Sequence, residues 1–82
     1  MLRTRAHIRL NTTEEASRFV SQLNTDGTID KYSIEDFNGV HRANARSLIG
    51  VIYAMSDFYD EMFLVNETHN GVYPNFVDAF RV

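Results

Sequence analysis

One short segment decides the fold of this chain, and it reads Ala45-Arg46-Ser47-Leu48-Ile49-Gly50-Val51-Ile52-Tyr53-Ala54-Met55. A basic residue and a serine open a helix that is apolar almost all the way round. A helix that only covers a sheet needs a single apolar stripe, so part of this helix is expected at the surface. We expect Ile49 and either Leu48 or Ile52 to be exposed, while Val51 and a residue one turn later face the sheet.

The composition is that of a small folded domain. The chain has 82 residues, of which 44% are hydrophobic and 23% are charged, and these proportions are typical of soluble globular proteins. We therefore expect a single domain over residues 1–82. The absence of cysteine fits a reducing, cytoplasmic compartment. The N-terminus lacks the apolar run of a signal peptide, and we expect no membrane-spanning segment.

Strict alternation over residues 3–10 predicts a strand with one buried face and one wet face. The wet face carries a basic stripe formed by Arg3, Arg5, His7 and Arg9. Such a stripe is typical of a solvated strand face, or of a surface for nucleic acid or an acidic partner. The formal net charge of −3 and the lack of aromatic residues within the stripe argue against nucleic acid.

A capping box predicts the start of the first helix. Thr12 occupies the N-cap position, and Glu15 follows three residues later. The apolar residues behind the cap recur at helical spacing and define one buried face, formed by Ala16, Phe19, Val20 and Leu23. Gly27 supplies the turn chemistry with which helices commonly end.

A hairpin is predicted over residues 28–43. Asn38-Gly39 near its middle is a preferred sequence for a type I′ turn, which has two residues with positive φ. That turn sets Glu35 opposite Arg42, where the two side chains would form a cross-strand ion pair on the open face.

The remaining elements complete an open-faced sandwich. Residues 56–60 are predicted to form a loop and residues 61–66 a strand, and Pro74 suits the first position of a short last helix. The predicted order is β-α-β-β-α-β-α. With one sheet face left open, this order gives an α+β open-faced β-sandwich, a four-stranded antiparallel sheet with the helices on one face.

This element order, with a second helix that opens on Arg46-Ser47-Leu48, resembles the HPr family, the small phosphocarriers of the bacterial sugar phosphotransferase system. The resemblance covers nearly the whole chain and is strongest over residues 45–52. It implies an HPr-like fold and makes Ser47 a regulatory phosphorylation site for a dedicated kinase. Taken without the resemblance, Ser47 is better explained as an ordinary N-cap serine. The resemblance also implies that protein partners dock on the second helix at Arg46, Leu48, Ile49 and Ile52.

The carrier site departs from the family pattern. The family's carrier histidine lies seven residues before the aromatic position that Phe19 matches, and Thr12 stands there in this chain. Glu14 and Glu15 occupy the positions of the family's arginine and proline. A hydroxyl needs a base to become a nucleophile, and two carboxylates repel a phosphate. The resemblance therefore implies a regulatory or protein-interaction module, which is neither an enzyme nor a competent phosphohistidine carrier.

The histidines His7, His41 and His69 are scattered and lack the spacing of metal ligands, so we expect no metal site and no cofactor. Two other functions stay open. One is a phosphocarrier with an unorthodox acceptor, and the other is a small nucleic-acid-binding module on the basic sheet face. The partner expected on the second helix is a serine kinase or a transcription regulator, and a homodimer also stays open.

Overall fold

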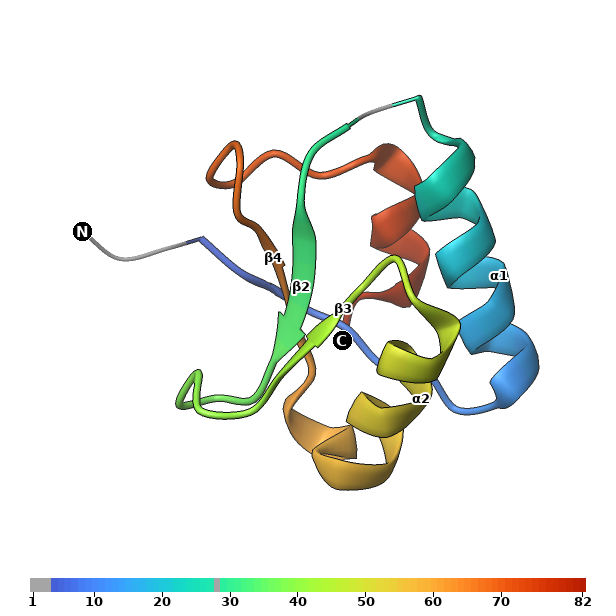
Figure 1. Ribbon diagram of the computed structural model, residues 1–82, viewed down its shortest axis with the longest axis vertical. Helices are drawn as coiled ribbons and strands as arrows, with labels where there is room; N and C mark the ends of the chain where they lie inside the picture. Colours follow the sequence, from blue (N-terminus) through green and yellow to red (C-terminus); the bar gives the residue numbers. More distant parts are fainter. Residues whose placement is uncertain (1–3, 28) are drawn as a thin grey trace.

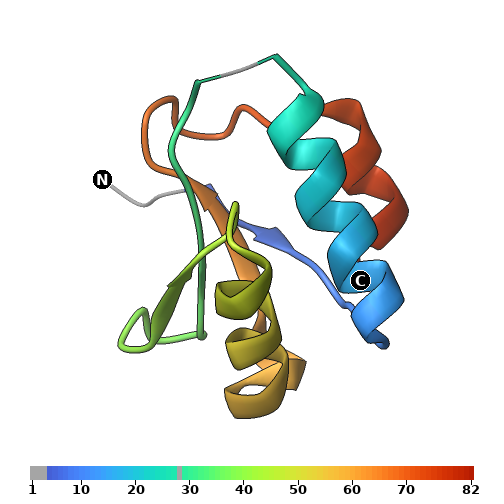
Figure 2. The same ribbon diagram turned by 45° about the vertical axis from the view of Figure 1, so that its right-hand side comes forward.

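The computed structural model describes residues 4–27 and 29–82. Its antiparallel sheet has four strands in the order β1-β4-β2-β3. The strands are β1 (Ala6–His7), β2 (Tyr32–Glu35), β3 (Arg42–Asn44) and β4 (Phe63–Asn66). The helical segments are α1 (Thr13–Thr25), α2 (Leu48–Asp57) and the 3₁₀ helices η1 (Tyr59–Glu61) and η2 (Asn75–Phe80). Figures 1 and 2 show α1, α2 and η2 on one side of the sheet, so the predicted α+β class with an open sheet is confirmed.

The first helix forms where the capping box places it. Thr12 has extended backbone angles, and its hydroxyl accepts a hydrogen bond from the Glu15 N–H at 3.0 Å. The Glu15 carboxylate accepts from the Asn11 N–H at 2.9 Å, one residue before the usual capping-box donor. The apolar face predicted for this helix is buried, and Phe19 is buried completely.

The last helix packs on α1 as a 3₁₀ helix. Phe76 and Phe80 of η2 approach the Phe19 ring edge-on, with centroids 5.8 and 5.4 Å away. Pro74 precedes η2 as its cap and does not occupy its first turn. No helix in the described part of the chain combines the length and apolar character that crossing a membrane requires.

The first strand is shorter than the predicted run over residues 3–10. Its inner side chains follow the alternation and are fully buried, namely Ala6, Ile8 and Leu10. The ladder with β4 ends at His7, and Ile8 instead bridges Arg81 near the other end of the chain. Arg3 lies outside the described residues.

The hairpin keeps its predicted register but not its predicted turn. Glu35 pairs with Arg42 in the ladder, as expected. The type I′ turn is wrong, because Gly39 has a φ of +72° and Asn38 does not share a positive φ. Instead, the Asp36 carbonyl accepts the Gly39 N–H at 3.0 Å, so the turn begins at Asp36. The connection between β2 and β3 is therefore longer than the two residues of a type I′ hairpin.

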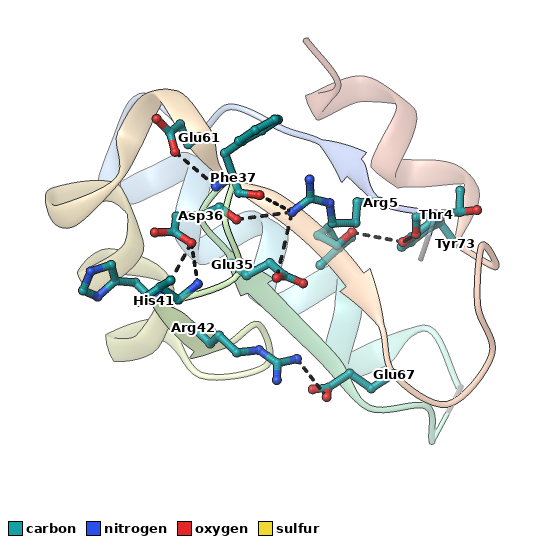
Figure 3. A network of polar contacts seen from close by, with 12 residues as sticks. Thr4, Arg5, Glu35, Asp36, Phe37, His41, Arg42, Glu61, Glu67 and Tyr73 are labelled. Atoms are coloured by element: carbon teal, nitrogen blue, oxygen red, sulfur yellow. Dashed lines mark hydrogen bonds and ion pairs between the residues drawn. The ribbon is translucent and has the colours of Figure 1, made fainter. Parts of the chain in front are cut away.

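The predicted ion pair between Glu35 and Arg42 is also wrong. The Glu35 carboxylate is almost completely buried and lies 3.9 Å from the guanidinium of Arg5, which reaches it across β4. Arg42 pairs at 2.9 Å with Glu67 on the far side of β2 (Figure 3). A hydrogen bond from the Ser33 hydroxyl, supported by the charge of Arg42, holds the pKa of Glu67 below its usual range. The order of the strands in the sheet, and not the hairpin register, therefore determines which charged side chains form ion pairs.

The second helix is longer than predicted. It runs to Asp57, and η1 follows at once, so residues 56–60 do not form the expected loop. At the last strand, Met62 and Leu64 are both fully buried.

Gly50 lets α2 lie against the end of β3. A Cβ on this residue would lie 2.8 Å from the Asn44 carbonyl oxygen and 3.3 Å from the Asn44 nitrogen. Both atoms belong to the backbone and cannot swing aside. The close approach turns Val51 and Ala54 into the core, where both are fully buried.

Replacing Gly50 with alanine is therefore expected to destabilise the protein. Helix propensity alone favours alanine by about 0.5–1 kcal/mol, but the overlap with Asn44 should outweigh this gain and cost roughly 1–3 kcal/mol net. Urea unfolding measures the difference. Ser56→Ala, at an exposed position of the same helix, should stay within about 0.5 kcal/mol of the wild type. A Gly50→Ala variant as stable as the wild type would contradict the close approach.

Candidate functional site

Ser47 is the N-cap of α2. It has extended backbone angles, and its hydroxyl accepts a hydrogen bond from the Gly50 N–H at 3.2 Å. The N–H groups of the first turn give this end of the helix a partial positive charge. No acidic residue in the first turn of α2 offsets that charge. An anion on Ser47 would therefore meet a favourable field.

Arg46 has a structural role that the sequence did not indicate. Its Nε and Nη2 donate to the Asp30 carbonyl at 3.1 and 2.8 Å, and its Nη1 donates to the Leu23 carbonyl at 2.8 Å. Leu23 lies near the end of α1, where a helix leaves its last carbonyls without intrahelical partners. The Arg46 guanidinium therefore links the end of α1 to the segment before β2, and docking of a partner at Arg46 stays a prediction.

The side of α2 that points away from the sheet is apolar. Ile49 is 81% exposed, Tyr53 is 44% exposed and Leu48 is 39% exposed, and Ile52 is half-buried beside them. These four residues, here called the α2 face, recur at helical spacing and form one continuous strip. The predicted exposure of Ile49 and Leu48 is confirmed, and docking on the strip stays a prediction.

The residues of the degenerate carrier site come together at the start of α1. Thr12 and Glu15 serve the helix cap described above. Glu14 pairs with Arg18 one turn later, at 3.5 Å. All three side chains therefore have a local structural role.

A hollow of about 390 Å³ beside this helix start was not foreseen from the sequence. Three arginines from separate segments line it, namely Arg9, Arg18 and Arg81. Each has a carboxylate partner, at 3.8, 3.5 and 2.8 Å respectively, in Asp60, Glu14 and Asp78. All three ion pairs are largely exposed, and none of the described lining residues is a histidine. The hollow thus lacks the imidazole that a phosphohistidine carrier needs.

The open sheet face carries aromatic rings that the strand pattern did not reveal. Phe63 of β4 stacks on His7 with 4.5 Å between ring centroids, and the Arg5 guanidinium lies 4.3 Å from the same ring. Arg9 lies over the ring of Tyr59. The side chains of Arg5, His7 and Arg9 are half-buried by these contacts, so the expected wet basic stripe is only partly exposed.

The other two histidines also have local partners. His41 is exposed, and its Nδ1 lies 3.7 Å from the Asp57 carboxylate. The Nδ1 of His69 lies 3.0 Å from the Asp30 carboxylate. Within residues 4–27 and 29–82, no three histidine, aspartate or glutamate side chains gather as a metal ion would require.

Comparison of the chain with protein-family models, with curated proteins and with solved structures finds no match.

The capping role of Thr12 can be measured. Thr12→Ala removes the oxygen that accepts the Glu15 N–H and should cost ~0.5–2 kcal/mol of unfolding free energy. Thr13→Ala, at the exposed next position, is the matched control and should cost less than about 0.5 kcal/mol. If Thr13→Ala were the costly change, the helix would start one residue later and the alignment of the carrier site would shift with it.

Proposed function

We propose that this protein is an HPr-like regulatory module of the bacterial cytoplasm that binds protein partners through the α2 face and does not carry phosphate on a histidine. The observation that carries this proposal is the exposed Ile49, with its apolar neighbours, beside a serine N-cap. A kinase that modifies Ser47 and a transcription regulator are the partner classes that the family resemblance favours.

The α2 face has the properties of a small docking surface. Its apolar residues lie on a helix fixed at Gly50 and Arg46, so little ordering would be needed on binding. Ile49 is the most exposed residue of the α2 face and is the natural anchor for a hydrophobic pocket on a partner. Scattered apolar side chains are common on protein surfaces, but a continuous strip along one helix favours an interaction site.

A phosphate on Ser47 would act on this surface without disturbing the fold. The helix N-terminus favours a negative charge by about 0.3–1 kcal/mol. The same charge would stand next to Leu48 and would oppose its burial against an apolar or acidic partner. Phosphorylation would therefore change the choice of partner more than it changes stability.

The alternative of a phosphocarrier with an unorthodox acceptor receives no support from the start of α1. The Thr12 hydroxyl is engaged by the Glu15 N–H, and the nearby carboxylates have capping and pairing roles. No imidazole lines the adjacent hollow among the described residues. A transferred phosphoryl group would therefore find no histidine acceptor among the described residues there.

The alternative of nucleic-acid binding on the open sheet face is not favoured either. Its arginines stand close to carboxylates, with Arg5 beside Glu35 and Arg42 beside Glu67. The ring of Phe63 already contacts Arg5 and His7, so it offers little surface to a nucleic-acid base. Nucleic-acid affinity depends on uncompensated positive charge, and the described residues of this face supply little of it.

Phosphotransfer tests the loss of the carrier function. Incubation with phosphoenolpyruvate and the first enzyme of the bacterial sugar phosphotransferase system should leave the intact mass unchanged, because no histidine lies at the start of α1. A genuine HPr added to the same mixture is the positive control. The gain of one phosphate on any histidine of this chain would disprove the proposal.

Docking is tested by affinity capture from the native cells with three versions of the protein. Wild type and Val72→Asp should recover the same protein, since Val72 is an exposed apolar residue in the connection after β4. Ile49→Asp should lose that protein by at least about tenfold, because a charge at the anchor prevents its burial. Equal recovery by all three versions would exclude the α2 face.

The switch is tested on the same captured protein. Ser47→Asp should alter its affinity by about tenfold or more, and Ser47→Asn should not, because asparagine caps a helix as well as aspartate but has no charge. Both variants should keep the unfolding free energy within roughly 0.5 kcal/mol of the wild type. If the asparagine variant changed binding equally, capping geometry and not charge would be responsible.

A further inference from the structure

The C-terminal end of α2 is surrounded by carboxylates from three elements. They are Asp57 of α2, Asp36 of the hairpin tip, and Asp60 and Glu61 of η1. These four residues, here called the acidic end, line a hollow of about 520 Å³ together with His41 and Phe58. Figure 3 shows Asp36, His41 and Glu61 grouped around the hairpin tip.

Little positive charge offsets the acidic end. Among the described residues, Arg9 is the only arginine or lysine in an ion pair with it, at 3.8 Å from the exposed Asp60 carboxylate. Arg5 lies under the hairpin tip, where its guanidinium bonds the Asp36 and Phe37 carbonyls, but its carboxylate partner is Glu35. Exposed pairs such as Arg9 with Asp60 contribute little.

Of the remaining contacts of these carboxylates within the described residues, only that of His41 with Asp57, at 3.7 Å, can bring a positive charge, and only when the imidazole is protonated. Asp36 accepts the Val40 and His41 N–H groups, and Glu61 accepts the Phe37 N–H at 3.1 Å. The last turn of α2 carries no basic residue, so the partial negative charge of the helix C-terminus adds to the side-chain charges.

The acidic end is continuous with the α2 face. The Tyr53 hydroxyl donates to the Asp57 carboxylate at 3.2 Å, and this bond, with the nearby charges of Asp57 and Asp36, raises the pKa of Tyr53. Tyr53 therefore belongs to the apolar strip through its ring and to the acidic end through its hydroxyl. A partner that covers Ile49 and Tyr53 would meet Asp57 next.

We infer that the partner presents a helix with apolar side chains against Leu48, Ile49 and Ile52 and a lysine or arginine against the acidic end. Ile49 and Asp57 are eight residues apart on one helix, which corresponds to roughly 12 Å. On a partner helix lying along α2, the basic residue would thus stand about eight positions from the apolar anchor. The inference rests on the proposed docking function and specifies the chemistry of its partner.

A second copy of this chain fits the surface less well. An antiparallel pair would bring the acidic end of one copy to the α2 N-terminus of the other. The arginine at that end is Arg46, whose guanidinium bonds carbonyls of its own chain. Held in this way, the Arg46 side chain cannot extend to a carboxylate of a second copy.

Two designed helical peptides test the inference. Both carry leucines at helical spacing, and about eight residues beyond the first leucine one peptide has two arginines and the other has two glutamates. Each is titrated into the isotope-labelled protein, and amide chemical shifts locate the binding. The arginine peptide should shift the resonances of residues 48–57 and bind at least about tenfold more tightly. The preference should shrink as salt rises from about 0.05 to about 0.5 M.

Two matched charge reversals test whether the acidic end causes the preference for the arginine peptide. Asp57→Lys should abolish or invert it, because it places a cation at the hollow. Asp26→Lys makes the same change at the end of α1, away from the C-terminal end of α2 in Figures 1 and 2, and should leave the preference intact. Lysine is favourable at both helix ends, so neither variant should lose its fold.

The outcomes separate this inference from the docking function. If both peptides bind α2 equally and Ile49→Asp abolishes both interactions, docking stands and the basic partner is excluded. If neither peptide shifts the resonances of α2, the docking function fails and the inference fails with it. A dimer in sedimentation equilibrium that Ile49→Asp dissociates would replace the basic partner with a second copy.

Discussion

The close approach of α2 to Asn44 is the constraint on which the rest of the structure depends. Because Gly50 has no Cβ, the helix backbone meets the backbone of the last residue of β3 at a distance that a side chain would not permit. This contact sets the rotation of α2 about its own axis, so that Val51 and Ala54 complete the core. The same rotation leaves Ile49 at the surface, so packing and exposure on this helix have a single cause.

The connection between β3 and α2 also provides hydrogen bonds to the end of α1. Arg46 donates to the Leu23 carbonyl near the end of α1 and to the Asp30 carbonyl before β2, and the Asn24 side chain donates back to the Arg46 carbonyl. No basic residue in the last turn of α1 performs this task locally. The start of α2 is therefore fixed from two directions, and Ser47 presents its hydroxyl on a rigid support.

The sequence predicted features that depend on near neighbours. The cap at Thr12, the buried face of α1 and the pairing of Glu35 with Arg42 in the ladder depend on spacing within one or two elements, and all are present. The partners of those two charges were predicted wrongly, since β4 inserts between β1 and β2 and brings in Arg5. Strand order depends on residues that are far apart in the sequence, so local periodicity does not predict it.

The same distinction between near and distant neighbours in the sequence applies to the candidate site. Exposure of Ile49 was predictable because α2 has more apolar residues than one core face can bury. The acidic end was not predictable, since it requires the hairpin tip to approach Asp57, as the contact with His41 shows. Together these features make α2 electrostatically asymmetric, with a positive N-terminus at Ser47 and a negative C-terminus. A phosphate on Ser47 would make both ends negative, so under the proposed function it would remove the asymmetry that orients a basic partner helix.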